Sequence, residues 1–261
     1  MATTTTPNPP RAVPQLANIT PLAQLRAGRL GRRLGQLTVG LVFYGISMAM
    51  MVRGTLGLDP WDVFHYGVAS GIPLTFGGVV IVTGVAVLLL WIPLRQMPGL
   101  GTVANAVLIG LATDAALAVL VAPESLLGRA GLLTGGILLN GLATALYIGS
   151  QFGPGPRDGL MTGLVRRTGW SVRVVRTSIE LTVVAVGWML GGVVGIGTIA
   201  YALAIGPLVQ ALLPRFVVEL PAPPQRLVAI STDESGATMT STEVNRSSVS
   251  HCSRSTSTRP A

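Results

Sequence analysis

The chain has 261 residues, of which 49% are hydrophobic and only 11% are charged, and its mean hydropathy is +0.62. This composition excludes an ordinary soluble domain and predicts an integral membrane protein. The formal net charge of +8 lies mainly in flanks and connections, so it indicates topology and gives no evidence for a nucleic-acid partner.

The chain begins with a stretch rich in threonine and proline, and we expect a disordered N-terminal tail over residues 1–24. No secretory signal peptide precedes the first apolar run, which is long enough for a full span. We therefore expect this span to act as an uncleaved signal anchor.

Six apolar runs approach or reach the roughly 20 residues that a helix needs to cross the hydrocarbon core. Two intervening stretches, residues 56–72 and 152–170, contain Asp, Pro, His and Arg at a density that lipid-facing helices do not tolerate. We predict short re-entrant or interfacial helices there. The six predicted spans are residues 34–52, 74–92, 99–121, 130–151, 171–192 and 195–213.

The first half of the chain is repeated 96 positions downstream. Arg33 recurs as Arg129, and seven of the twelve residues in 99–110 are identical in 195–206. An apparent two-residue insertion before Gly169 interrupts the register. Three crossings per copy make the copies antiparallel, which is typical of secondary transporters.

We therefore predict an all-α polytopic membrane protein with six transmembrane helices. They form two inverted three-helix repeats, residues 25–121 and 122–218, and each repeat contains a short re-entrant or interfacial helix. The alternative makes the two short segments full crossings, which gives eight spans and parallel repeats.

The arginines test this span count, because basic residues concentrate in cytoplasmic loops. With six spans, only Arg53 and Arg129 fall on the side opposite to the chain ends. Both termini are therefore predicted to be cytoplasmic. The arginines on the terminal side are Arg26, Arg29, Arg32, Arg33, Arg95, Arg157, Arg166, Arg167, Arg215 and Arg226.

Each predicted short helix has a start signal. Asp59 is the predicted N-cap, a proline follows as the first helical residue, and Asp62 accepts from N–H groups of the first turn. Residues 155–158 repeat this pattern with glycine in the cap, and they include Arg157 and Asp158. A helix of roughly 11 to 13 residues spans about half a bilayer.

Two interpretations of the short helices stay open. In the first, Pro and Asp only cap an interfacial turn, and Trp61, Phe64 and Tyr66 form an aromatic belt. In the second, these helices and His65 line a substrate path, because a half-length helix that begins at depth presents backbone donors and its dipole to anionic groups.

Charged residues also lie inside the predicted spans. Arg173, Arg176 and Glu180 follow the spacing i, i+3 and i+7, which places them on one helical face. We expect Glu180 to have a partner on another helix, since this order is the poorer one for an i,i+4 pair. The face either fixes helix packing or takes part in transport, and Asp114 and Glu180 are candidates for proton coupling. Asn105 belongs to the same buried polar set.

Other polar and aromatic residues in the spans have simpler explanations. Tyr44, Tyr147 and Tyr201 are interpreted as packing residues with satisfied hydroxyls rather than as ligands. Asn140 completes the polar set of the predicted membrane core.

The C-terminal stretch, residues 219–261, is rich in Ser and Thr, and we expect it to be disordered. His251 and Cys252 lie there, and one isolated pair lacks the ligand count of a zinc site, so no metal or other cofactor is expected. His65 is the only histidine outside this tail, and no His-Glu-x-x-His or Gly-x-Ser-x-Gly signature is present. We therefore do not expect an enzyme.

Three segments carry a resemblance to a known family: Leu-Gly-Leu-Asp-Pro-Trp-Asp-Val-Phe-His at 56–65, Gly-Pro-Gly-Pro-Arg-Asp-Gly-Leu-Met-Thr-Gly at 153–163, and Gly-Ile-Gly-Thr-Ile-Ala at 195–200. On these, residues 34–213 resemble the YczE-like membrane proteins of bacteria, relatives of the wider YitT group. The resemblance implies a bacterial cytoplasmic-membrane protein and names no activity or substrate. YitT-type relatives often end in a folded cytosolic domain, and the Ser/Thr-rich tail does not match one.

The leading hypothesis is a small-solute transporter or exporter that moves one three-helix repeat against the other, with the half-helices at 59–71 and 155–169 as outer and inner gates. Arg157 and Asp158 would line the cytoplasmic path, and Glu180 with the two arginines of its face would bind or couple. The alternative is a non-transporting scaffold that assists a membrane or biosynthetic enzyme. The expected partners are the lipid bilayer and an unknown small solute, and a homo-oligomer is left open.

Overall fold

A computed structural model describes residues 21–220, which contain helices and no strands. Most of both predicted tails, with Arg226, His251 and Cys252, lies outside the described residues, while residues 21–24 lie in the first helix. The helices of the described part are α1 (Pro21–Arg26), α2 (Leu30–Gly54), α3 (Pro60–Gly71), α4 (Phe76–Trp91), α5 (Leu100–Val119), α6 (Leu126–Gly149), α7 (Pro156–Thr168), α8 (Val172–Met189) and α9 (Ile196–Phe216).

Four of these helices are long and apolar enough to cross a membrane by length and composition: α2, α5, α6 and α9. A fifth span is possible if α3 and α4, which are bent by 115° at their junction, count as one. Alone, α4 has 16 residues and a length of about 24 Å, which is short for a hydrocarbon core of about 30 Å. Three of the 18 residues of α8 are charged. The protein is thus an all-helical chain with four to five candidate spans.

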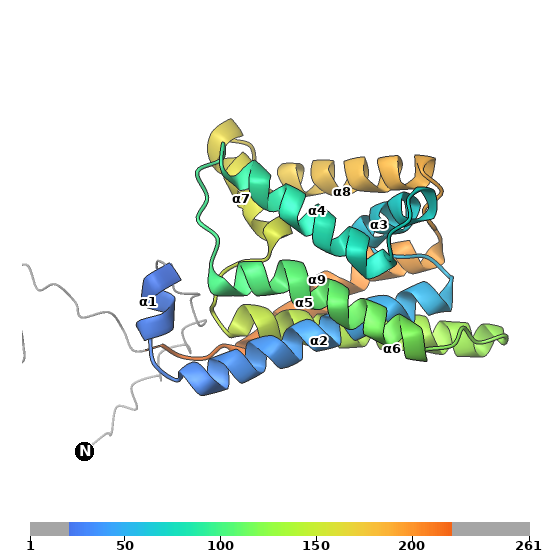
Figure 1. Cartoon of the computed structure of the whole chain (residues 1–261), viewed down its shortest axis with the longest axis horizontal. Helices are drawn as coiled ribbons and strands as arrows, with labels where there is room; N and C mark the ends of the chain where they lie inside the picture. Colours follow the sequence, from blue (N-terminus) through green and yellow to red (C-terminus); the bar gives the residue numbers. More distant parts are fainter. Residues whose placement is uncertain (1–20, 221–261) are drawn as a thin grey trace, which may run out of the picture. The chain divides into compact units, whose positions relative to one another are not determined.

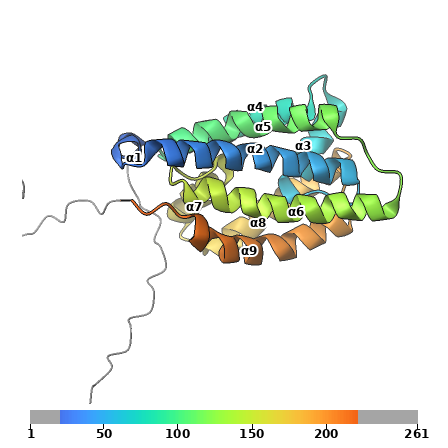
Figure 2. The ribbon, with the colours of Figure 1, turned by 90° about the horizontal axis from the view of Figure 1, so that it is seen from below.

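The helices form two layers. The four long helices lie side by side in the order α5, α2, α6, α9, as seen in Figure 2, and each packs against its neighbours in that order. The shorter helices α3, α4, α7 and α8 form the second layer above them (Figure 1), in which α3 packs against α8 and α4 against α7.

Buried apolar side chains fill the space between the layers. One cluster includes Leu41, Met48 and Val80, and a second includes Met51 and Val63. Each cluster therefore draws on a long helix of the first layer and a short helix of the second.

The 96-residue offset seen in the sequence recurs in the helix boundaries. No insertion is required before Gly169, because the helix after it starts in register; the predicted interruption is wrong. The four pairs of helix starts, each 96 positions apart, are Leu30 and Leu126, Pro60 and Pro156, Phe76 and Val172, and Leu100 and Ile196.

The helices α2 and α6, which occupy the same place in the two halves, are antiparallel. Arg33 near the start of α2 donates from Nε to the carbonyl of Ser150 at the end of α6, at 2.9 Å. Further along both helices, Asn140 of α6 donates to the hydroxyl of Ser47 on α2 at 2.9 Å. Gly54, which ends α2, lies beside the first turns of α6.

The loop before each short helix crosses to the other half of the chain. The N–H of Gly101 donates to Phe152 at 2.9 Å, and the N–H of Gly197 donates to Leu56 at 2.8 Å, so the two bonds join equivalent positions. The next residue in each loop is a glycine with positive φ, +121° at Gly57 and +106° in the second half. A side chain at Gly57 would also meet the N–H of Thr198 at 2.8 Å, which explains why the loop needs glycine here.

Candidate functional site

The start of α3 gathers three buried polar side chains. Asp59 caps the helix and accepts from the N–H of Asp62 at 2.8 Å, with proline in the first turn, so the predicted cap is confirmed. His65 lies one turn further, and its Nδ1 is 3.2 Å from Asp62 Oδ1. All three side chains are at most 1% exposed.

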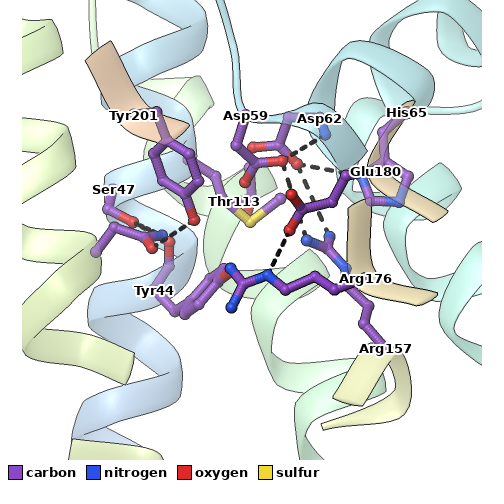
Figure 3. A network of polar contacts seen from close by, with 12 residues as sticks. Tyr44, Ser47, Asp59, Asp62, His65, Thr113, Arg157, Arg176, Glu180 and Tyr201 are labelled. Carbon is purple, nitrogen blue, oxygen red and sulfur yellow. Dashed lines mark hydrogen bonds and ion pairs between the residues drawn. The ribbon is translucent and has the colours of Figure 1, made fainter. Parts of the chain in front are cut away.

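Arg157 lies in the first turn of α7, the helix that corresponds to α3 in the second half, and reaches across to α3. Its Nη1 and Nη2 each lie 4.0 Å from a carboxylate oxygen, the first from Asp59 and the second from Asp62. The guanidinium also stacks over the ring of Trp61, with 4.9 Å from Cζ to the ring centre. Figure 3 shows this arginine pointing at the two aspartates. The starts of the two short helices therefore meet, and one cation faces two anions.

Asp158 follows Arg157 and accepts from the hydroxyl of Tyr147 at 3.0 Å. It lies in the first turn of α7, where the cap residue is a glycine without a side-chain bond. A carboxylate in a first turn is favoured by the helix dipole. Both short helices thus carry their own acidic residues at the N-terminus, so these termini do not present bare donors to a free anion.

Arg176 and Glu180 form an ion pair on α8, with Arg176 Nε 2.9 Å from Glu180 Oε1. The expected partner of Glu180 on another helix is therefore wrong: the pair is made within one helix turn, although this order is the weaker one. Their side chains are 56% and 36% exposed to space not filled by protein. Arg173 is also exposed and lines neither of the cavities described below.

A cavity of about 290 Å³ lies between the second layer and the helices α6 and α9. Both halves of the chain line it, and its wall combines charged and aromatic side chains. The charged residues are Asp59, Arg157, Asp158, Arg176 and Glu180, and the aromatic ones are Tyr44, Trp61, Tyr147 and Tyr201.

A smaller cavity of about 90 Å³ lies towards α4 and α5 and includes His65 and Asn105 in its wall. Arg157 and Asp158 line both cavities, together with three of the aromatic residues. The predicted candidates Asp59, His65, Asn105, Arg157, Asp158, Arg176 and Glu180 are thus brought to one pair of adjoining cavities, with Asp62 buried beside them.

Asp114 lies elsewhere. It accepts from the hydroxyl of Thr75 at 2.6 Å and from the N–H of Gly77 at 2.7 Å, and so joins the start of α4 to α5. Its position in the other half is taken by Gln210, which lines the larger cavity. The geometry makes Asp114 a clamp between two helices.

The four aromatic residues of the larger cavity were interpreted from sequence as packing residues or as an aromatic belt. Two tyrosines do have satisfied hydroxyls, since Tyr147 donates to Asp158 and Tyr201 donates to Asn140 at 3.1 Å. They also line the cavity, which the sequence did not reveal. The repeat contained one signal for this role. Trp61 occupies the position that Arg157 has in the second half, so it could have been grouped with Arg157 as a candidate lining residue.

Comparison with known proteins places the chain in a family. Residues 31–214 match the model of a family of unknown function, DUF6198. The chain belongs to this family. It is 40% identical over 185 residues to an uncharacterized protein of Haemophilus influenzae, covering 71% of this chain and 84% of the relative.

One relative is described as a membrane protein. The chain is 33% identical over 180 residues to the uncharacterized membrane protein YczE of Bacillus subtilis, covering 68% of this chain and 84% of that protein. It is 26% identical over 183 residues to the uncharacterized protein YyaS of the same organism, covering 67% of this chain and 90% of that protein. No solved structure matches the chain. The resemblance to the YczE-like proteins is confirmed, and the relation to the YitT group stays a prediction.

Proposed function

We propose that this protein is a small-solute transporter or exporter of the bacterial cytoplasmic membrane. The observation that carries the proposal is the cavity of about 290 Å³, whose five charged residues come from both halves of a bundle of candidate spans. Charged side chains at membrane depth are costly, and they are retained where they line a path for water, ions or solutes.

The proposed architecture is six spans in two inverted repeats, with α4 and α8 as the additional crossings. The antiparallel course of α2 and α6 supports it, as do the paired helix boundaries. The meeting of Arg157 with Asp59 supports the assignment of α3 and α7 as half-length helices that enter from opposite faces and begin near the midplane.

The larger cavity extends towards the side of the chain ends. It is lined by the last turns of α6 and the second half of α9, and these ends lie beside the start of α2, since Val218 donates to Gly149 and Arg33 to Ser150. With both termini cytoplasmic, as the arginines predict, the cavity faces the cytoplasm.

The related helix pairs α4–α5 and α8–α9 would be the two gates. A Cβ added to Gly110 on α5 would overlap the carbonyl oxygen of Gly77 on α4, so the two helices touch. The equivalent Gly206 on α9 has nothing within 4 Å of such a Cβ. This difference supports a state with the outer gate closed and the inner gate open.

The motion that best fits this geometry is a tilt of the layer α3, α4, α7 and α8 over the four long helices. Within this layer the packing of α3 on α8 and of α4 on α7 joins the two halves, so it can move as a unit. The inner closure would be looser than the outer one, because Arg173 stands where the first half has Gly77 and its side chain prevents an equally close approach.

The test is solute uptake into vesicles reconstituted with the purified protein. A panel of amines, amino acids, sugars and carboxylates would be offered to the wild type, Asp158→Asn and Glu180→Gln. Both variants should take up less solute at equal protein content, because each removes a charge from the cavity wall. Glu124→Gln is the matched control, since it removes an exposed carboxylate that does not line the cavity.

Wild-type vesicles that take up none of the panel would contradict transport. That result would favour a non-transporting scaffold or accessory protein, in which the charges of the wall only fix helix packing.

A further inference from the structure

We infer that the solute held in the larger cavity is a small organic cation. The inference deepens the proposed function and rests on it, because it takes this cavity as the solute path. Its basis is a surplus of negative charge in the wall combined with aromatic rings, and both can be followed residue by residue.

The first part of the surplus lies at the start of α3. Asp59 and Asp62 share the single guanidinium of Arg157, and at 4.0 Å both approaches are longer than a hydrogen bond. The second oxygen of each carboxylate, Oδ2, is buried without a hydrogen-bond partner in the described part of the chain. A buried carboxylate oxygen without a donor is costly, so this place favours an additional positive group.

The second part of the surplus is Asp158, which accepts from the neutral hydroxyl of Tyr147 and lies near Arg157 and Arg176, two cations that are already shared with the other carboxylates. The remaining charged residues of the wall, Arg176 and Glu180, neutralise each other at 2.9 Å. The wall with Asp62 therefore holds four carboxylates and two guanidiniums. In a low-dielectric surrounding, such an excess attracts a cation and disfavours an anion.

The aromatic rings favour an organic cation over an inorganic ion as the solute. Tyr44, Trp61, Tyr147 and Tyr201 line the cavity, and the faces of aromatic rings attract ammonium and guanidinium groups. Arg157 already uses Trp61 in this way. The described residues contain no group of three His, Cys, Asp or Glu side chains placed to hold a metal ion. A volume of about 290 Å³ is at the small end of ligand pockets and suits a compact amine.

Binding to the purified full-length protein tests the inference without any need for transport. Benzylammonium, benzyl alcohol and benzoate share one ring and differ in charge, and tetraethylammonium adds a cation without N–H donors. Isothermal titration calorimetry and thermal unfolding would be run with each compound. We expect saturable binding of benzylammonium, a rise in Tm with its concentration, and neither effect for benzoate.

Three variants locate the binding. Asp59→Asn and Asp158→Asn should each weaken benzylammonium binding by about tenfold, since each removes one charge-assisted contact. Asparagine caps helices as well as aspartate does, so Asp59→Asn preserves the start of α3. Arg157→Gln should strengthen the binding, because it removes the internal cation that competes for the aspartates. Glu124→Gln should bind as the wild type does.

Several results would overturn the inference: preferred binding of benzoate, equal binding of benzyl alcohol and benzylammonium, weaker binding by Arg157→Gln, or no binding of either cation. Stabilisation by acid alone, without a response to either cation, would also overturn it, because protons would then neutralise the wall. Uptake of acidic or neutral solutes without cation binding would leave transport standing and remove only this inference. Cation binding without uptake of any solute would support the cation site and contradict transport.

Discussion

The helix pairs α4–α5 and α8–α9 occupy equivalent places in the two halves of the chain, but they are packed very differently. On the first pair, Gly77 and Gly110 allow backbone contact, and Asp114 holds the start of α4. On the second pair, Arg173 replaces Gly77, and the space beside Gly206 is open.

The same comparison extends along the two helices. The first half has Val80 and Gly84 where the second has Arg176 and Glu180, and a Cβ at Gly84 would lie 3.1 Å from that of Ala106. Small and apolar residues close one interface, while charged residues leave the other open to a cavity. One repeated fold thus yields a closely packed side and a polar side, and the first three predictions below compare equivalent positions of the two.

The largest expected effect comes from locking the packed pair. In a Cys252→Ser background, Thr75→Cys with Asp114→Cys should form a disulfide, because the native side chains are in hydrogen-bond contact. Oxidation should abolish solute uptake by vesicles, and reduction should restore it, since the gate can then open. The equivalent pair, Ser171→Cys with Gln210→Cys, should resist oxidation in the state described. Unchanged uptake in the locked protein would contradict alternating gates.

The next effect is on stability. Gly110→Ala should lower the stability of the purified protein by about 1–3 kcal/mol, because the new methyl group overlaps the Gly77 carbonyl and Ile81. Gly206→Ala at the equivalent position should be neutral or stabilising by up to about 1 kcal/mol, since its space is open and alanine favours a helix. Thermal unfolding in detergent measures both. Equal destabilisation by the two variants would show that α8 also packs on α9.

Thiol labelling compares access to the two sides. Val209→Cys lines the larger cavity, whereas the equivalent Thr113→Cys replaces a side chain that is 0% exposed. In the Cys252→Ser background, a membrane-impermeant maleimide should label the first cysteine and leave the second unmodified. The reagent should react from the cytoplasmic face, which also tests the predicted orientation. Labelling only from the opposite face would invert the proposed topology.

The smallest effect is expected for the exposed ion pair. Glu180→Gln should change the stability of the protein by no more than about 0.5 kcal/mol, because both partners are more than a third exposed and such pairs contribute little. Thermal unfolding of the wild type, Glu180→Gln and the control Glu124→Gln measures this change in stability. A loss of several kcal/mol would assign the pair to helix packing and remove Glu180 from the functional candidates.

Much of the local structure could be predicted because its causes are local. Hydropathy gave the membrane class and the position of each long helix, and the Asp-Pro signal gave the start of α3 at Pro60. The charged face of α8 was recognised, but its pairing was not, because the helix spacing of Arg176 and Glu180 allowed a contact that orientation rules disfavour. The six spans and the inverted repeats stay predictions.

The sequence by itself determined that this is a helical membrane protein, since composition, periodicity and capping act over a few neighbouring residues. It also determined the 96-residue repeat, which is read by comparing the two halves of the sequence. Only the tertiary structure decided that Arg157 meets Asp59 and Asp62, that four aromatic residues join them around a cavity, and that one helix pair is packed while its counterpart is not. These features depend on side chains nearly a hundred positions apart, and their distances follow from how the layers pack, which no local pattern encodes.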